Sequence, residues 1–87
     1  MYRALIKNYI SNLTPIQVKQ FASSKDVTLT EQEVIYLTNF VKQNWETFLY
    51  HNPEPLFQEA SKYVRPEIIQ IAKKEFQEAK QKYQSFL

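Results

Sequence analysis

The chain has 87 residues, which is enough for one domain with a modest hydrophobic core. It contains no cysteine, which excludes disulfides, thiolate metal sites and cysteine nucleophiles. It also contains no glycine, which argues against a phosphate-binding Walker loop, a dinucleotide-binding turn and Asn-Gly hairpins.

The net charge of +2 is unevenly distributed along the chain. Residues 1–25 carry four basic and no acidic side chains, residues 26–59 carry one basic and six acidic, and residues 60–87 carry six basic and three acidic. We expect basic and acidic helices that lie side by side and neutralise each other. The alternative is a basic face for nucleic acid or for an acidic partner.

Along the chain, residues 2–13 have apolar side chains at helical spacing, and we expect this first helix to end within residues 8–11. Thr14 then caps a short second helix, with Pro15 at its favoured first position. A polar connector over residues 23–26 and an extended stretch over residues 27–29 follow.

Two motifs of the form Leu-Thr-x-x-Gln/Glu-Val mark helix starts, at residues 13–18 and 29–34. In each motif the threonine hydroxyl is placed to accept a hydrogen bond from the third residue of the helix. The Gln or Glu at that third position can bond back to the threonine N–H, which completes a capping box. The motifs therefore set the register of the second and third helices.

The third helix starts at Thr30, and its apolar residues follow one face at steps of three and four: Val34, Leu37, Val41, Trp45 and Phe48. Two positions for the C-terminal end of this helix are compatible with the sequence, one near Asn44 and one near Tyr50. The prolines at positions 53 and 55 break the helical pattern after it. Because glycine is absent, we expect helix ends to use asparagine or other polar side chains, with Asn12, Asn44 and Asn52 as candidates.

A short fourth helix is expected over residues 55–64, and Pro66 opens the last helix. The last helix carries an apolar seam at alternating steps of three and four: Ile69, Ala72, Phe76, Ala79, Tyr83 and Phe86. We favour a helix that faces the core of a bundle. The alternative is a homodimer through Ile69, Phe76 and Tyr83. No stretch has the pattern of a strand, so the sequence predicts an all-α fold, a single small bundle of four or five helices over residues 1–87.

No constellation for catalysis, metal binding or cofactor binding is present. His51 is the single histidine, and no other residues stand at the spacing of metal ligands. Glu75 and Glu78 share a helix face, but they lie among lysines on a polar stretch rather than in an apolar cleft. We therefore expect no enzyme, and no catalytic, metal or cofactor site.

A helix-turn-helix is disfavoured, because the segment between the two capped helices is longer than that motif allows. The second of these helices also begins with Glu31 and Glu33, which repel phosphate. A looser nucleic-acid contact would use a basic face on the N- and C-terminal helices: Arg3, Lys7, Lys73, Lys74, Lys80 and Lys82.

The stretches Ile10–Pro15, Phe21–Ala22 and Leu29–Gln32 resemble the uncharacterised family of short Bacillus-type proteins typified by YqfT. The similarity covers residues 5–42 and, more loosely, the helix-Pro-helix pattern around Pro66. It departs from that family at residues 43–44, where the family tends to carry a glycine. The family has no assigned activity, so the resemblance implies only a cytoplasmic protein of a low-GC Gram-positive bacterium.

By elimination, we expect a small non-catalytic protein-interaction or regulatory module that presents a helical surface to an unknown protein partner. The candidate partner surface consists of Trp45, Phe48 and Tyr50, because the chain is rich in aromatic residues for its size. The alternative is a nucleic-acid-binding protein that uses the basic face. We expect a cytoplasmic protein, because the absence of cysteine suits a reducing compartment. We expect no membrane span, because no apolar run approaches the necessary length.

Overall fold

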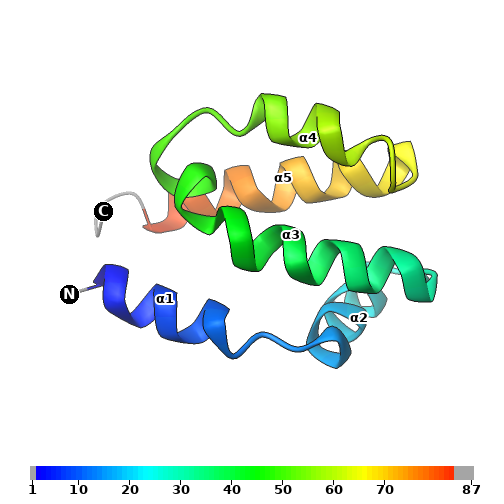
Figure 1. Ribbon diagram of the computed structural model, residues 1–87, viewed down its shortest axis with the longest axis horizontal. Coiled ribbons are helices and arrows are strands. Elements are labelled where there is room, and N and C mark those ends of the chain that lie inside the picture. The colour runs from blue at the N-terminus through cyan, green and yellow to red at the C-terminus, as the bar shows by residue number, and fades with distance from the viewer. Residues whose placement is uncertain (1, 84–87) are drawn as a thin grey trace. The chain divides into compact units, whose positions relative to one another are not determined.

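The computed structural model describes residues 2–83 and contains only helices in that range (Figure 1). The prediction of an all-α fold with four or five helices is confirmed. The helices are α1 (Tyr2–Ser11), α2 (Pro15–Ser24), α3 (Glu31–Tyr50), α4 (Glu54–Ala60) and α5 (Pro66–Tyr83).

The chain groups into two compact units, a first unit over Arg3–Asn44 and a second unit over Trp45–Leu87. Helix α3 contributes residues 31–44 to the first unit and residues 45–50 to the second. A single domain over residues 1–87 stays a prediction. The open question about the end of α3 is resolved in favour of Tyr50.

Both predicted capping boxes are formed. At α2, the Gln17 N–H donates to Thr14 Oγ1 at 3.2 Å, and the Thr14 N–H donates to Gln17 Oε1 at 2.9 Å. At α3, the Glu33 N–H donates to Thr30 Oγ1 at 3.1 Å, and the Thr30 N–H donates to Glu33 Oε1 at 3.0 Å. The two boxes differ in burial, because Glu33 is only 4 % exposed whereas Gln17 is exposed.

The end of α2 is a Schellman motif, which was not predicted from the sequence. The Val27 N–H donates to the Ala22 carbonyl at 2.9 Å, and the Asp26 N–H donates to the Ser23 carbonyl at 3.0 Å. Asp26 has φ of 60°, so an aspartate occupies the left-handed position that glycine usually takes. Residues 27–30, which include the stretch predicted to be extended, have no regular secondary structure.

The three asparagines proposed for helix ends have different outcomes. Asn12 bonds to the end of α1, since its Nδ2 donates to the Asn8 carbonyl at 2.9 Å. Asn52 lies before α4, where its Oδ1 accepts a hydrogen bond from the Glu54 N–H at 3.1 Å. The proposal for Asn44 is wrong, because this residue lies inside α3 and its side chain bonds to the carbonyl one turn earlier.

Helix α4 is shorter than the predicted span of residues 55–64. It ends at Ala60, and a turn follows in which Ser61 Oγ donates to the Gln58 carbonyl at 2.6 Å. Arg65 precedes Pro66, and a residue before proline is biased away from helical backbone angles. The chain therefore leaves the helix before Pro66, which opens α5 as predicted.

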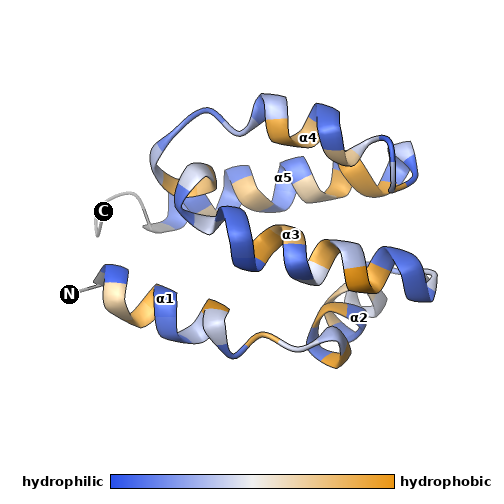
Figure 2. Ribbon diagram, in the orientation of Figure 1, coloured by the Kyte–Doolittle hydropathy of each residue, from blue (hydrophilic) through white to orange (hydrophobic). Residues whose placement is uncertain are grey.

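The core of the second unit is built around three phenylalanine rings. Phe48 stacks on Phe76 with ring centroids 4.1 Å apart and on Phe57 with centroids 5.5 Å apart. Helices α4 and α5 lie side by side in opposite directions, and the hydrophobic residues of α4 lie on the side that faces α5 (Figures 1 and 2). The buried residues of this unit are Phe48, Phe57, Ala60, Val64, Ile68 and Ile69.

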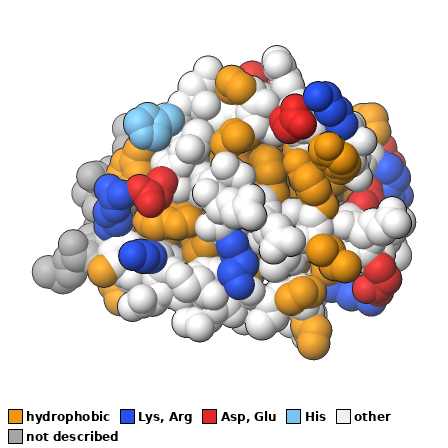
Figure 3. Space-filling view, in the orientation of Figure 1, with side chains coloured by type: hydrophobic (Ala, Val, Ile, Leu, Met, Phe, Trp, Pro, Cys, Tyr) orange, Lys and Arg blue, Asp and Glu red, His pale blue; other side chains and the backbone are white. Residues whose placement is uncertain are grey.

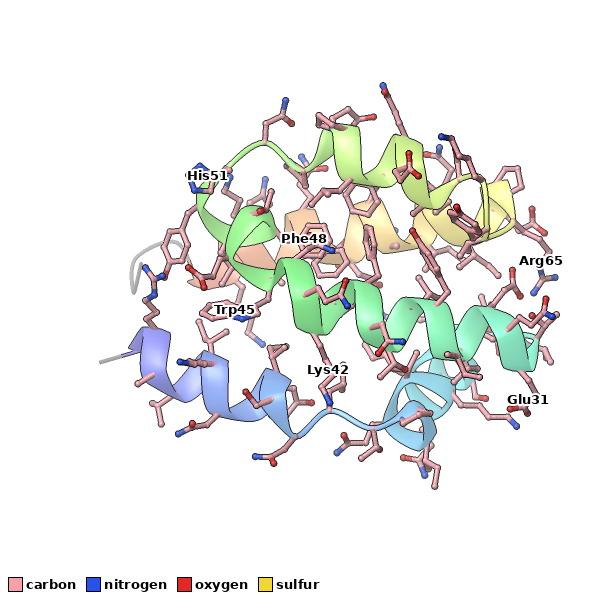
Figure 4. The ribbon with its side chains drawn as sticks, in the orientation of Figure 1. Glu31, Lys42, Trp45, Phe48, His51 and Arg65 are labelled. Atoms are coloured by element: carbon pink, nitrogen blue, oxygen red, sulfur yellow. The ribbon has the colours of Figure 1, made fainter. Side chains whose placement is uncertain are left out.

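The buried residues of the first unit come from the segment before α3 and from α3 itself: Leu29, Glu33, Val34, Thr38 and Phe40. The buried Thr38 hydroxyl is hydrogen-bonded within the helix, because its Oγ1 donates to the Val34 carbonyl at 2.7 Å. Lys42 extends from α3 to the segment that links α1 and α2, where its Nζ donates to the Leu13 carbonyl at 3.2 Å (Figure 4). This hydrogen bond connects the middle of α3 to that linker.

Candidate protein-interaction surface

The predicted partner surface of Trp45, Phe48 and Tyr50 is not a single surface. Phe48 is 2 % exposed and is a core residue of the second unit, so its assignment to a partner surface is wrong. Trp45 is half-buried and Tyr50 is exposed. Residues two apart point to opposite sides of a helix, so the burial of Phe48 directs Tyr50 outward.

The predicted homodimer seam also lies within the second unit. Ile69 is buried, and Phe76 stacks on Phe48 and lies tilted against Phe57, with ring centroids 5.9 Å apart. These two residues pack within the core of their own chain, which supports the core-facing interpretation. A homodimer through Ile69, Phe76 and Tyr83 stays a prediction. The side chain of Tyr83 and the whole of Phe86 lie outside the described residues.

The predicted basic face is spread over two units, with Arg3 and Lys7 on α1 and the other four residues on α5. Lys73 is engaged inside the second unit, since its Nζ lies 2.8 Å from Glu54 Oε1 and 5.9 Å from the centroid of the Phe57 ring. Lys74 is exposed, and Lys80 and Lys82 lie in the last turn of α5. Lysines in the last turn of a helix interact favourably with its dipole, so these two have a structural role as well.

Across residues 2–83, the side chains considered for metal binding do not converge on one site. His51 is exposed directly after α3, at the position labelled in Figure 4. Across residues 2–83, no three His, Cys, Asp or Glu side chains converge where they could hold a metal ion. Within the same residues, each helix is either too short or too polar to cross a lipid bilayer.

Exposed large apolar side chains gather in the first unit. Leu5 and Tyr9 on α1 are 60 % and 66 % exposed, and Ile16 and Phe21 on α2 are 68 % and 51 % exposed. Ile35 on α3 is a fifth member of this group. In the described part of the second unit, the large hydrophobic residues exposed in this way are Tyr50 and Tyr63, at 36 % and 60 %.

Neither α2 nor the described side chains of α1 include a buried residue. Val18 and Ala22 are half-buried, while Ile16 and Phe21 point to solvent. Figure 3 shows hydrophobic side chains protruding where Figure 1 places α2. The sequence carried a signal for this exposure, since Ile16 and Val18 are two residues apart and cannot occupy one face of a helix.

Comparisons with protein-family models, with curated proteins and with solved structures find no match to this chain. The similarity to YqfT-type proteins therefore stays a prediction.

Proposed function

We propose that the protein is a non-catalytic protein-interaction or regulatory module that binds a protein partner through α1 and α2. The observation that carries this proposal is the exposure of Leu5, Tyr9, Ile16 and Phe21, each more than half accessible to water. Single exposed hydrophobic residues are ordinary on protein surfaces. Four large ones on two consecutive short helices leave a substantial apolar area in water, and we take this area as the interaction site.

The energetics support burial by a partner. Removing apolar surface from water contributes about 25 cal/mol per Å². The second unit uses its large apolar residues in its core, as the stack of Phe48, Phe57 and Phe76 illustrates. The first unit leaves a comparable set exposed, so a partner that covers α1 and α2 gains the hydrophobic contribution that the chain itself does not use.

The test is quantitative capture of proteins from an extract of the source cells with the full-length chain as bait. Two variants remove the exposed apolar side chains, Leu5→Gln with Tyr9→Gln on α1 and Ile16→Gln with Phe21→Gln on α2. The matched control is Tyr63→Gln, which changes an exposed aromatic residue of the second unit. We expect at least one captured protein to fall tenfold or more with the α1 or α2 variant and to be retained by the control.

Equal capture by the wild type, both double variants and the control would contradict the proposal. Circular dichroism of each variant separates a lost surface from a lost fold. Because the four residues are exposed, substitution with glutamine should leave the helical signal close to that of the wild type.

A further inference from the structure

Helix α2 lies between two points at which the chain is attached to α3. Before α2, the Leu13 carbonyl accepts a hydrogen bond from Lys42 Nζ at 3.2 Å. After α2, Leu29 is 7 % exposed, and the next residue, Thr30, forms the capping box that starts α3. Residues 14–28 are therefore a segment of the first unit with an attachment at each end.

The hydrogen bonds that cap α2 begin and end within this segment. The Thr14–Gln17 capping box closes the start of the helix. At its end, the Asp26 and Val27 N–H groups donate to the carbonyls of residues 23 and 22. The caps of α2 therefore depend on neighbours in the sequence and contribute nothing to the attachment of α2 to α3.

The packing of α2 against the rest of the first unit is shallow. None of its residues is buried, and the half-buried ones are Val18 and Ala22. Lys19 Nζ lies 3.3 Å from Glu31 Oε1 at the start of α3, and both side chains are more than half exposed (Figure 4). Because an exposed ion pair is screened by water, this contact contributes little to the attachment of α2.

Helix α3 differs from α2 in this respect. Val34, Thr38 and Phe40 are buried side chains of its part in the first unit. Segments with few buried apolar contacts open at a lower free energy than the core of the same protein. A helix of about ten residues is also marginal in water once it loses its packing. Burial therefore ranks α2 below α3 in local stability.

We propose that residues 14–28 are a detachable strap: α2 separates from α3 while α3 and the second unit stay folded. Its two attached ends keep the strap close to α3, so its return is intramolecular and closes only a short loop. Opening exposes Val18 and Ala22 in addition to Ile16 and Phe21. The use of this opening rests on the proposed function, because an open strap offers a partner four apolar side chains of α2 instead of two.

The experiment is native-state amide hydrogen exchange of the full-length chain, measured by NMR in water and in low concentrations of urea. Relative to their intrinsic rates, the amides of residues 19–22 should exchange about tenfold or more faster than those of residues 38–41. Their exchange should change little with urea, because opening the strap exposes much less surface than global unfolding.

Two variants separate opening of the strap from unfolding of the whole chain. Ile69→Val shortens a buried side chain of the second unit and should speed exchange in α5 about threefold or more, without changing residues 19–22. Thr14→Ala removes the hydroxyl of the α2 capping box and should speed exchange of residues 19–22 about threefold.

Equal protection of residues 19–22 and 38–41 would overturn the strap. A rise in α2 exchange that parallels α5 in Ile69→Val would also overturn it, because α2 would then open only when the whole chain unfolds. The free chain is sufficient for these measurements, so they are independent of partner capture. Opening of the strap without a captured partner contradicts the proposed function alone, and a captured partner without opening contradicts the strap alone.

Discussion

Replacing Asp26 with glycine should stabilise the protein. Asp26 adopts φ of 60° at the end of α2, a left-handed conformation that costs an L-residue about 1–2 kcal/mol, with aspartate near the lower end. Its negative charge also lies at the negative end of the helix dipole, which costs about 0.3–1 kcal/mol. Glycine removes both costs and adds about 0.5–1 kcal/mol of entropy loss on folding. The net expectation is a gain of about 1 kcal/mol.

The assay is urea denaturation followed by far-UV circular dichroism, with thermal unfolding as a second measurement. A gain of 1 kcal/mol should raise Tm by roughly 4–8 °C in a domain of this size. Asp26→Asn removes the charge and keeps a residue that tolerates the left-handed region, so its stability should fall between wild type and Asp26→Gly. Asp26→Ala retains the backbone penalty without a side chain that can bond locally, and should be the least stable of the three variants.

A destabilising Asp26→Gly would refute this reasoning. So would an Asp26→Ala variant as stable as Asp26→Gly, because both results would mean that the left-handed backbone at position 26 carries no cost. The dipole contribution has its own check, since the gain from Asp26→Asn should shrink as salt is raised.

Four further substitutions have defined outcomes. Thr30→Ala should lower the free energy of unfolding by about 1–2 kcal/mol and Thr14→Ala by about 0.5–1 kcal/mol. The loss is larger at Thr30 because only its capping box involves a buried carboxylate, that of Glu33. Urea denaturation of both variants checks that Thr30→Ala is the less stable of the two. Phe48→Ala should cost about 3–5 kcal/mol in the same measurement, since it leaves a cavity beside two stacked rings, and a loss under 1 kcal/mol would contradict its core position. The hydrogen bond and charge of Glu59 raise the pKa of Lys62, so the pair contributes its stability below the unfolded-state pKa and loses it as the pH rises through the higher folded-state pKa. Glu59→Gln should lower the pKa of Lys62 in an NMR titration, and an unchanged pKa would show that the pair does not form in solution.

The local structure of this chain was largely predictable from sequence. The two Leu-Thr motifs placed the starts of α2 and α3, because a capping box involves residues only three positions apart. Pro66 placed the start of α5 for a similar reason, since proline restricts its own backbone and that of the residue before it. The end of α2 escaped prediction because aspartate is less common than glycine or asparagine at a left-handed helix end.

The sequence by itself determined that the chain is helical, where most helices begin, and that its charge changes from basic to acidic and back. The tertiary structure decided which apolar residues are used inside the fold. Phe48 and Ile16 are both large and apolar, yet one is 2 % exposed within a stack of rings and the other is 68 % exposed on α2. Helical periodicity gives the side of a helix on which a residue lies, but burial depends on packing between residues distant in sequence. Because of this packing, the candidate interaction surface lies on α1 and α2 rather than at the end of α3, where it was predicted.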